Sequence, residues 1–302
     1  MSGYLLLCPG QGAQHPAMLG FALATTEGTQ AIAEAAESAG IDIAKRVLAG
    51  DDLFEPVFAQ VCMVTAAMAT WRSLARWLPA PAAFAGYSVG EVASWGCAGT
   101  WSVAESIAIV KRRAQFMVDA SPPGCSMMAV TGITQEVVEH ALGNDVHVAI
   151  EVEADHWIVA GRRADVEKAG EAMTAAGACL HPLPVSVPSH TPLLSNAAES
   201  LRQVLKATPG REPQAPVLRG IDGRALFARA DAADALADAV SKPIRWRAVL
   251  QEATERGLAI ALELPPGAGL TKMFRNTASV DARAVADFRS VEGVARWIER
   301  AL

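Results

Sequence analysis

The segment best suited to covalent chemistry is residues 86–90, GYSVG, which carries the G-x-S-x-G pattern around Ser88. A short apolar run, residues 82–85, precedes it, and an amphipathic stretch beginning at Glu91 follows it. Between a strand and a helix this pattern forms a nucleophile elbow, in which small residues allow a sharp turn that presents the serine hydroxyl. The N–H of Val89 then points toward a developing oxyanion. Glycines around a serine also make ordinary turns, so at this point Ser88 is a candidate nucleophile.

A serine nucleophile needs a general base, and His190 is the histidine in a loop of unusual sequence. That loop, residues 184–192 (PVSVPSHTP), contains three prolines, which restrict its backbone. A rigidly displayed imidazole could lie within about 2.6 to 3.2 Å of the Ser88 hydroxyl, as base catalysis requires. The ordinary alternative is a surface or capping histidine, which we assign to the five others: His15, His140, His147, His156 and His181.

A buried arginine is the third candidate. On a helix that starts at Ser102, the apolar residues form one stripe, Arg112 falls opposite it, and Arg113 lies on its flank. We therefore expect Arg112 to be solvated and Arg113 to emerge from mostly apolar surroundings, where a guanidinium needs an anion. A carboxylate on the substrate would suit the planar fork. The alternatives are a snorkelling arginine or one paired with an internal carboxylate.

The elements that must position these residues alternate between strands and helices. Residues 4–8 and 82–85 have the apolar character of buried strands, and the spacing of apolar residues predicts helices over 25–39, 57–78 and 102–120. This alternation is typical of a parallel α/β sheet.

The rhythm changes after residue 125. Strand-like and helical stretches then follow in the order βαββαβ, which is the ferredoxin-like unit, over residues 127–131, 134–142, 146–152, 157–160, 164–176 and 179–185. Turn-forming residues 121–124 (SPPG) and Pro188 bound it. We predict a small domain, residues 125–190, inserted into a large domain formed by residues 1–124 and 191–302.

Composition excludes several classes of protein. The chain has 302 residues, 51% of them hydrophobic, which is too many for a disordered protein. Its 26 basic and 32 acidic residues give a net charge of −6, so we expect neither nucleic acid nor anionic membrane as a partner. The most apolar run, residues 57–69, is too short to span a membrane, and the amino-terminal apolar run ends at Pro9 without a basic segment. We expect a cytoplasmic protein.

The five cysteines are widely spaced and contain no C-x-x-C pair. We expect buried free thiols in a reducing compartment, not disulfides or a zinc site. No group of His, Asp and Glu has the spacing of metal ligands, so we expect no metal.

Three segments together resemble one family, the malonyl-CoA:acyl-carrier-protein transacylases. They are residues 9–12 (PGQG) after the first strand, 86–91 (GYSVGE) at the elbow, and 187–190 (VPSH) after the small domain. Further matches are Gln60, Arg113 and residues 263–267 (ELPPG). The resemblance covers nearly the whole chain in the same order. It implies a large α/β-hydrolase-like domain with a ferredoxin-like insert.

The resemblance also implies roles for single residues. Ser88 would be acylated with His190 as its base, and the N–H groups of Gln11 and Val89 would form the oxyanion hole. Arg113 would bind the malonyl carboxylate, and Gln60 would belong to the substrate site. In the family, a main-chain carbonyl holds the catalytic histidine. The matching position here precedes Gly257 and would be Arg256.

The implied reaction is ping-pong transfer: malonyl-CoA acylates Ser88, CoA leaves, and the thiol of an acyl-carrier protein attacks the malonyl ester. Malonyl-CoA is then the substrate and no cofactor is bound permanently. Tyr87 stands where most of the family has histidine, and residues 8–16 (CPGQGAQHP) resemble the branch that serves malonate decarboxylase. We therefore expect the carrier subunit of malonate decarboxylase as acceptor, with a transacylase of fatty-acid or polyketide synthesis as the alternative.

Two other classes of protein compete with this interpretation. A serine hydrolase or thioesterase would use the same elbow but predicts an acidic triad partner, and a catalytically silent scaffold would not need Ser88, His190 and Arg113 together. Because carrier proteins of this family are generally acidic, docking needs a local basic surface. Lys272 and Arg275 on one side of the site, with Arg162 and Arg163 on the small domain, are the candidates.

Overall fold

The computed structural model describes residues 3–302; Met1 and Ser2, which the predicted large domain includes, lie outside the described residues. Its larger sheet has six strands in the order β11-β10-β1-β2-β7-β8. Neighbouring strands are parallel except for β7 and β8, which are antiparallel. The strands are β1 (Tyr4–Cys8), β2 (Ala83–Gly86), β7 (Val217–Leu218), β8 (Ala225–Leu226), β10 (Ile260–Glu263) and β11 (Asp281–Ala284). The predicted parallel sheet is thus present, with one antiparallel edge strand.

Helices cover both faces of this sheet. Leu6 and Phe84 face one core, packed against helices such as α2, α4 and α6, whereas Leu5 and Ala85 face a second core with α11 and α12. The helices are α1 (Gly20–Leu23), α2 (Thr26–Ala39), α3 (Ile43–Ala49), α4 (Pro56–Leu74), α5 (Gly90–Cys97), α6 (Val103–Ala120), α9 (Ser195–Ala207), α10 (Arg229–Ser241), α11 (Trp246–Glu255), α12 (Gly269–Thr277) and α13 (Val291–Ala301), with 3-10 turns at Pro192–Leu194 and Val285–Asp287.

Helices α6 and α4 both begin at side-chain caps. Ser102 and Glu105 form a capping box at the start of α6, and the Glu55 carboxylate accepts hydrogen bonds from two N–H groups of the first turn of α4. Helix α4 is long and apolar enough by length and composition to cross a membrane, but 89% of that window is buried inside the fold. Such burial is typical of a core helix.

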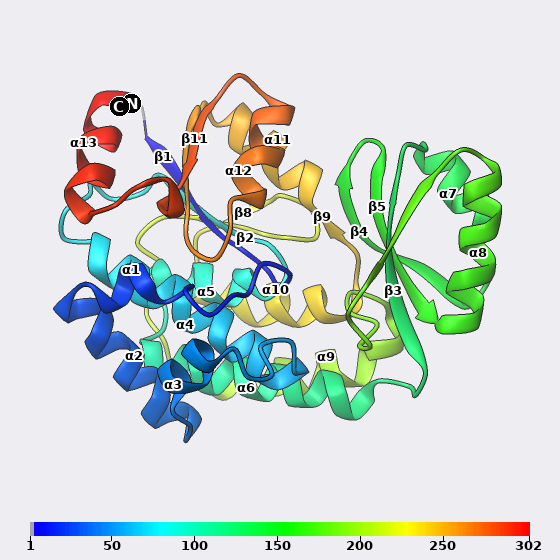
Figure 1. The fold of residues 1–302 in the computed structure, drawn as a ribbon, viewed down its shortest axis with the longest axis horizontal. Coiled ribbons are helices and arrows are strands. Elements are labelled where there is room, and N and C mark those ends of the chain that lie inside the picture. The colour runs from blue at the N-terminus through cyan, green and yellow to red at the C-terminus, as the bar shows by residue number, and fades with distance from the viewer. Residues whose placement is uncertain (1–2) are drawn as a thin grey trace.

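The second sheet is built mainly from the predicted βαββαβ unit. Its strand order, β6-β3-β5-β4-β9, contains the ferredoxin-like arrangement with antiparallel neighbours, seen at the right of Figure 1. The elements are β3 (Cys125–Thr131), α7 (Gln135–Ala141), β4 (Val146–Glu153), β5 (His156–Arg162), α8 (Arg163–Ala175) and β6 (Cys179–Leu183). The fifth strand, β9 (Ile244–Arg245), comes from the other part of the chain and pairs parallel to β4. Residues 125–190 stay our proposed extent of the small domain.

The cysteines differ from the prediction at one position. Four of them are buried with free thiols, but Cys179 is exposed. It lies on β6, the edge strand of the small sheet, where none of the residues is fully buried. The strand predicted over residues 179–185 is present as β6, and the prediction of a buried thiol is wrong for Cys179 alone among the cysteines.

Candidate active site

Ser88 stands on a sharp turn between β2 and α5. Its φ is +56°, in the left-handed region that residues with a side chain rarely adopt. A Cβ atom at Gly86 would collide with the backbone of Gly90 and Glu91, and one at Gly90 would collide with the carbonyl oxygen of Cys8. Both glycines are therefore needed for the turn to close, and the strained serine is presented at the beginning of α5.

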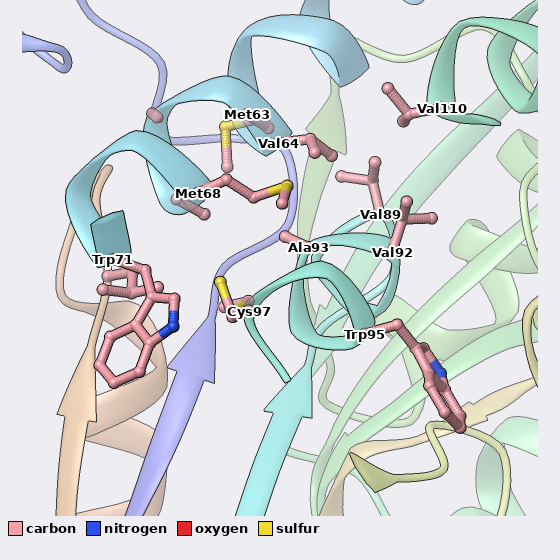
Figure 2. Close-up of a cluster of buried hydrophobic side chains, with 14 of the residues drawn as sticks. Met63, Val64, Met68, Trp71, Val89, Val92, Ala93, Trp95, Cys97 and Val110 are labelled. Atoms are coloured by element: carbon pink, nitrogen blue, oxygen red, sulfur yellow. The ribbon is translucent and has the colours of Figure 1, made fainter. Parts of the chain in front are cut away.

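Helix α5 fixes this turn because its whole length is buried. Val92, Trp95 and Cys97 belong to the same core as Met63 and Met68 of α4, and Figure 2 shows the side chains of the two helices packed together. The serine at the start of this helix is therefore attached to a fully packed element.

The two predicted oxyanion donors leave the sheet at the same edge. Strands β1 and β2 are parallel neighbours with Cys8 opposite Gly86, so the chain continues from both toward Gln11 and Val89. A Cβ atom at Gly10 would lie 2.7 Å from the carbonyl oxygen of Tyr87, which shows how closely the first loop approaches the elbow. Val89 is the N-cap residue of α5, where the helix itself offers no acceptor for the N–H.

His190 completes a pair with Ser88. Its Nε2 lies 2.8 Å from Ser88 Oγ, and its Nδ1 donates to the carbonyl oxygen of Ala239 in α10. Because a carbonyl only accepts hydrogen bonds, the proton resides on Nδ1 and the lone pair of Nε2 faces the serine hydroxyl. Burial, and secondarily the charge of Arg113, lowers the pKa of His190 to about 3. The imidazole is therefore a neutral base at physiological pH.

The carbonyl that holds His190 is not the one we predicted. The side chain of Arg256, the C-cap residue of α11, is directed instead to Glu252, 2.7 Å from its Nε, and over the ring of Phe227. The prediction is wrong because it placed the carbonyl at the end of α11, whereas His190 contacts the end of the preceding helix, α10. No residue type marks such a position, because every residue has a carbonyl.

Arg113 and Gln60 are brought together in the core. Arg113 is 2% exposed while Arg112 is exposed, as the helical pattern predicts. Arg113 Nη1 donates to Oε1 of Gln60, but its Nη2 is buried without a hydrogen-bond partner among the described residues. Burial lowers the pKa of Arg113 to about 10, which leaves it charged at neutral pH. An unmatched N–H beside a buried positive charge is suited to binding an anion.

A cavity of about 160 Å³ adjoins Gln60, although Arg113, Ser88 and His190 are not among the residues that line it. Gln11 and Gln60 line it together with Phe54 and the Leu183–Ser189 segment that leads to His190. A larger cavity of about 730 Å³ lies elsewhere, around Trp71 and Trp101, and none of the predicted site residues lines it.

The surroundings of Tyr87 and Glu91, close to Ser88 in the sequence, were not predicted from the GYSVGE motif. Tyr87 packs edge-on against Trp246, with ring centroids 5.3 Å apart, and burial raises its pKa above the ordinary value. Glu91 is fully buried, and desolvation raises its pKa to about 8, an effect that Gly220, Arg219 and Arg113 only partly offset. The glutamate of GYSVGE could be placed on a helix from sequence, but its burial without a close cation could not.

The four predicted basic residues, Arg162, Arg163, Lys272 and Arg275, are all exposed. Lys272 and Arg275 lie on α12, which begins just after Gly267, and a Cβ atom at Gly267 would be 2.9 Å from Ala13 of the first loop. Arg162 ends β5, at the end of the small sheet where Leu183 also lies, because both strands pair with the beginning of β3.

Comparison with known proteins identifies this arrangement. Residues 5–299 match the family described as the acyl transferase domain. The malonyl CoA-acyl carrier protein transacylase of Salmonella typhimurium is 31% identical over 299 residues, covering 93% of this chain and 96% of the relative. That of Haemophilus influenzae is 30% identical over 309 residues, covering 97% and 99%.

Solved structures agree along the whole chain. A malonyl-transacylase in complex with a type II PKS acyl-carrier protein superimposes with a TM-score of 0.93 at 31% identity, covering 98% of this chain and 99% of that one. FabD from Acinetobacter baumannii gives a TM-score of 0.94 at 26% identity, covering 100% and 99%. The predicted α/β fold is confirmed, and the chain is an acyltransferase that belongs to the malonyl-CoA:acyl carrier protein transacylase family.

Proposed function

We propose that this chain moves a malonyl group from malonyl-CoA to Ser88 and then to the thiol of an acyl carrier protein. The observation that carries the proposal is the hydrogen-bonded series from Ser88 through His190 to the Ala239 carbonyl, next to a buried arginine with an unmatched N–H. The series supplies a nucleophile and its base. The arginine can bind the carboxylate of an acyl group, which favours malonyl as the group transferred.

The first half-reaction follows from the atoms in place. Nε2 of His190 takes the proton from Ser88 as Oγ attacks the thioester carbonyl, whose carbon–oxygen π electrons move to the oxygen. The N–H groups of Val89 and Gln11 bind that oxyanion. When the tetrahedral intermediate collapses, the carbon–sulfur bond breaks and the proton on Nε2 passes to the CoA sulfur. Ser88 then carries a malonyl ester, and CoA leaves as a thiol.

The second half-reaction is the reverse with a new thiol. The thiol of the carrier protein gives its proton to Nε2, and its sulfur attacks the malonyl ester. When the tetrahedral intermediate collapses, the bond between the malonyl carbonyl carbon and Oγ of Ser88 breaks and Oγ takes the proton back from Nε2. The malonyl group leaves as a thioester of the carrier protein. No acidic residue is required, because the imidazolium that forms in each half-reaction faces the carboxyl-terminal end of α10, where the helix dipole is negative.

We propose Arg113 and Gln60 as the residues that select malonyl groups. The amide oxygen of Gln60 accepts one N–H of the guanidinium and so fixes its plane. The remaining N–H groups are then available to the malonyl carboxylate. A planar, pre-positioned donor set loses little entropy when the substrate binds.

We propose an acyl carrier protein of fatty-acid or polyketide synthesis as the acceptor. The amino-terminal resemblance pointed to the carrier subunit of malonate decarboxylase, but the relatives are named malonyl CoA-acyl carrier protein transacylases, and one solved neighbour is bound to a type II PKS acyl-carrier protein. Transfer rates with the two kinds of carrier test this choice. A clear preference for the decarboxylase subunit would overturn it. We keep the cytoplasm, where the four buried thiols would stay reduced, as the proposed location.

Intact-mass spectrometry tests the central proposal. Mixed with malonyl-CoA and no acceptor, the protein should gain one malonyl group, and Ser88→Ala should gain none. Fragmentation should place the group on Ser88. Rapid release of CoA with no adduct on the protein would indicate a thioesterase and would contradict the proposal.

A further inference from the structure

The carbonyl that holds His190 is free because of a proline. In a regular helix the Ala239 oxygen would accept from the N–H four residues later, but that residue is Pro243, which has none. Helix α10 ends at Ser241, and the last intrahelical bond from this turn runs from Lys242 N to Asp238 O at 2.8 Å. The next two carbonyls are both taken by the histidine: Ala239 O accepts from Nδ1, and Val240 O accepts from the backbone N–H at 2.9 Å. His190 therefore caps the carboxyl-terminal end of α10.

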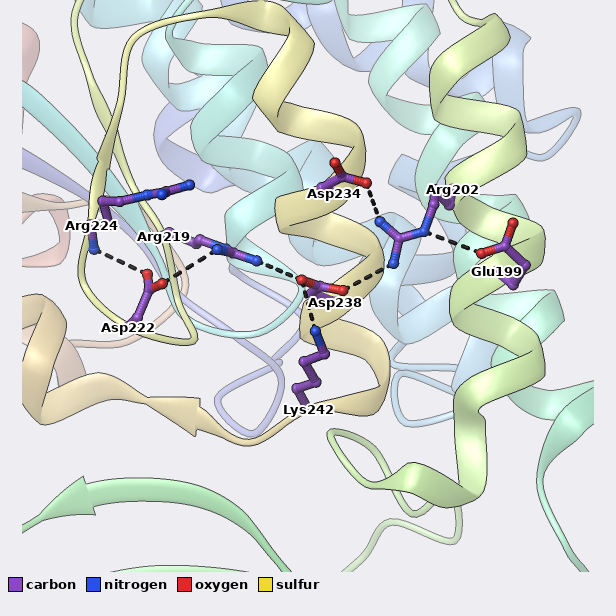
Figure 3. Close-up of polar contacts among 8 residues, drawn as sticks. All are labelled: Glu199, Arg202, Arg219, Asp222, Arg224, Asp234, Asp238 and Lys242. Atoms are coloured by element: carbon purple, nitrogen blue, oxygen red, sulfur yellow. Dashed lines mark hydrogen bonds and ion pairs between the residues drawn. The ribbon is translucent and has the colours of Figure 1, made fainter.

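The residue directly before Ala239 lies at the centre of an ion cluster. The Asp238 carboxylate lies 2.9 Å from Arg202, 2.5 Å from Arg219 and 3.1 Å from Lys242 (Figure 3). Its side chain is 12% exposed, and those of Arg202 and Arg219 are 20% and 13% exposed. Burial would raise the pKa of Asp238, but the hydrogen bonds and charges of Arg202 and Lys242 outweigh it and hold the pKa below its ordinary value. The carboxylate is therefore charged throughout the neutral range.

The two arginines of this cluster come from segments that are connected to His190 and to Ser88. Arg202 lies on α9, which follows His190 after a single 3-10 turn. Arg219 directly follows β7, and β7 is the parallel neighbour of β2, the strand that leads to Ser88. Asp238 thus connects the histidine segment and the elbow side of the sheet to the helix end that holds the imidazole.

We propose that Asp238 is a positioning residue for the transfer reaction, and that Pro243 keeps the Ala239 carbonyl open for His190. Asp238 acts through the backbone: by pinning the last turn of α10 to α9 and to the segment after β7, it fixes the carbonyl of the next residue and hence the direction of Nε2. The inference rests on the proposed roles of Ser88 and His190. In serine hydrolases a carboxylate orients the histidine directly. Here the carboxylate lies one residue before the carbonyl that contacts His190, and orients the ring through the backbone.

The test compares two aspartates that contact the same arginine. Asp238→Asn keeps the shape of the side chain but removes its charge. Asp234→Asn removes one of the two other carboxylates that contact Arg202, the second being Glu199. The Asp234 side chain is 60% exposed and is separated from Ala239 by more than a turn of helix. We measure the rate of Ser88 acylation by quenched intact-mass spectrometry over a range of malonyl-CoA concentrations and between pH 5 and 9. Asp238→Asn should slow maximal acylation by about 10- to 100-fold while the malonyl-CoA concentration for half-maximal rate changes less than about twofold, because Arg113 and Gln60 are untouched. Asp234→Asn should stay within about twofold of wild type in both.

A spectroscopic readout separates positioning from general loss of structure. The proton between Nδ1 of His190 and the Ala239 carbonyl should give a downfield proton resonance, assigned by its absence in His190→Gln. It should weaken or shift in Asp238→Asn and in Pro243→Ala, in which a new N–H competes for the carbonyl, and should persist in Asp234→Asn. Unchanged resonance and rate in folded Asp238→Asn would overturn the inference, as would equal losses in the two aspartate variants. If the wild-type protein itself forms no Ser88 adduct, the proposed function fails instead.

Discussion

Removing the buried guanidinium should change which acyl group the enzyme accepts. We expect Arg113→Ala to slow acylation by malonyl-CoA about a hundredfold and acylation by acetyl-CoA severalfold at most. Acetyl has no carboxylate, so it makes no use of the charge. The change in the ratio of the two rates is therefore the quantity to measure.

The magnitude follows from the surroundings of the side chain. Arg113 is 2% exposed, so its interaction with a carboxylate is not weakened by water as a surface pair would be. One Nη group is already bound to Gln60, and the other has no partner among the described residues. Hydrogen bonds to charged groups contribute about 1.5 to 3 kcal/mol each. Two such bonds to the malonyl carboxylate give about 3 kcal/mol at the lower end, which is about a hundredfold in rate.

The assay uses rates of Ser88 acylation by the two thioesters, followed by intact mass. Arg112→Ala is the matched control, because Arg112 is the neighbouring residue on the same helix but is exposed, and it should leave both rates unchanged. Arg113→Lys should recover part of the malonyl rate, since it keeps a charge but loses the planar fork. If Arg113→Ala slows acetyl and malonyl transfer equally, the arginine is structural and the reasoning is refuted.

Three further predictions concern charge. Because the pKa of His190 is lowered to about 3, kcat/KM for malonyl-CoA should stay nearly flat between pH 8 and 5, whereas a histidine with a pKa of 6.5 would lose about 30-fold by pH 5; a loss of that size would contradict the buried neutral base. The pKa of Glu91 is raised from 4.5 to about 8. The stability that its neutral form contributes is therefore full below pH 4.5, falls as pH rises above 4.5, and is lost once pH has risen through 8. Glu91→Gln should therefore show a smaller drop in Tm between pH 6 and 9 than wild type, and an unchanged drop would argue that the carboxyl is ionised throughout. Reversing Lys272 and Arg275 to Glu should raise KM for the carrier protein severalfold and weaken its salt dependence, while Ser88 acylation is unaffected; an unchanged carrier KM would exclude this patch.

The sequence predicted those features that depend on residue type and period. The elbow at Ser88 could be predicted because such a turn requires small residues around its serine, and the collisions that a Cβ would cause at Gly86 and Gly90 are the physical form of that requirement. The burial of Arg113 beside an exposed Arg112 followed from helical periodicity alone. The βαββαβ order followed from the alternation of short apolar runs.

Features that depend on pairing between distant segments were not predictable in this way. Strand β9 has two residues, Ile244 and Arg245, and no pattern in so short a segment shows that it will extend the small sheet beside β4. Likewise, nothing in the sequence around Glu91 shows that its carboxyl will be enclosed, because burial there depends on how Gly220 and its neighbours pack against α5.

The Ala239 carbonyl that accepts from His190 was missed, although the sequence contains a residue that marks it. A main-chain acceptor cannot be identified by residue type, so alignment to the family by the glycine at 257 led to Arg256. A helical carbonyl is open to such an acceptor role where no N–H four residues later can bond to it. A proline four residues after a helical position meets this condition, as Pro243 does for Ala239, whereas no proline stands four residues after Arg256. In the mechanism that we propose, the same helix end also takes the place of a third acidic side chain: its two open carbonyls accept from His190, and the Nδ1 bond orients the imidazole and favours the positive charge that the ring would acquire during each transfer.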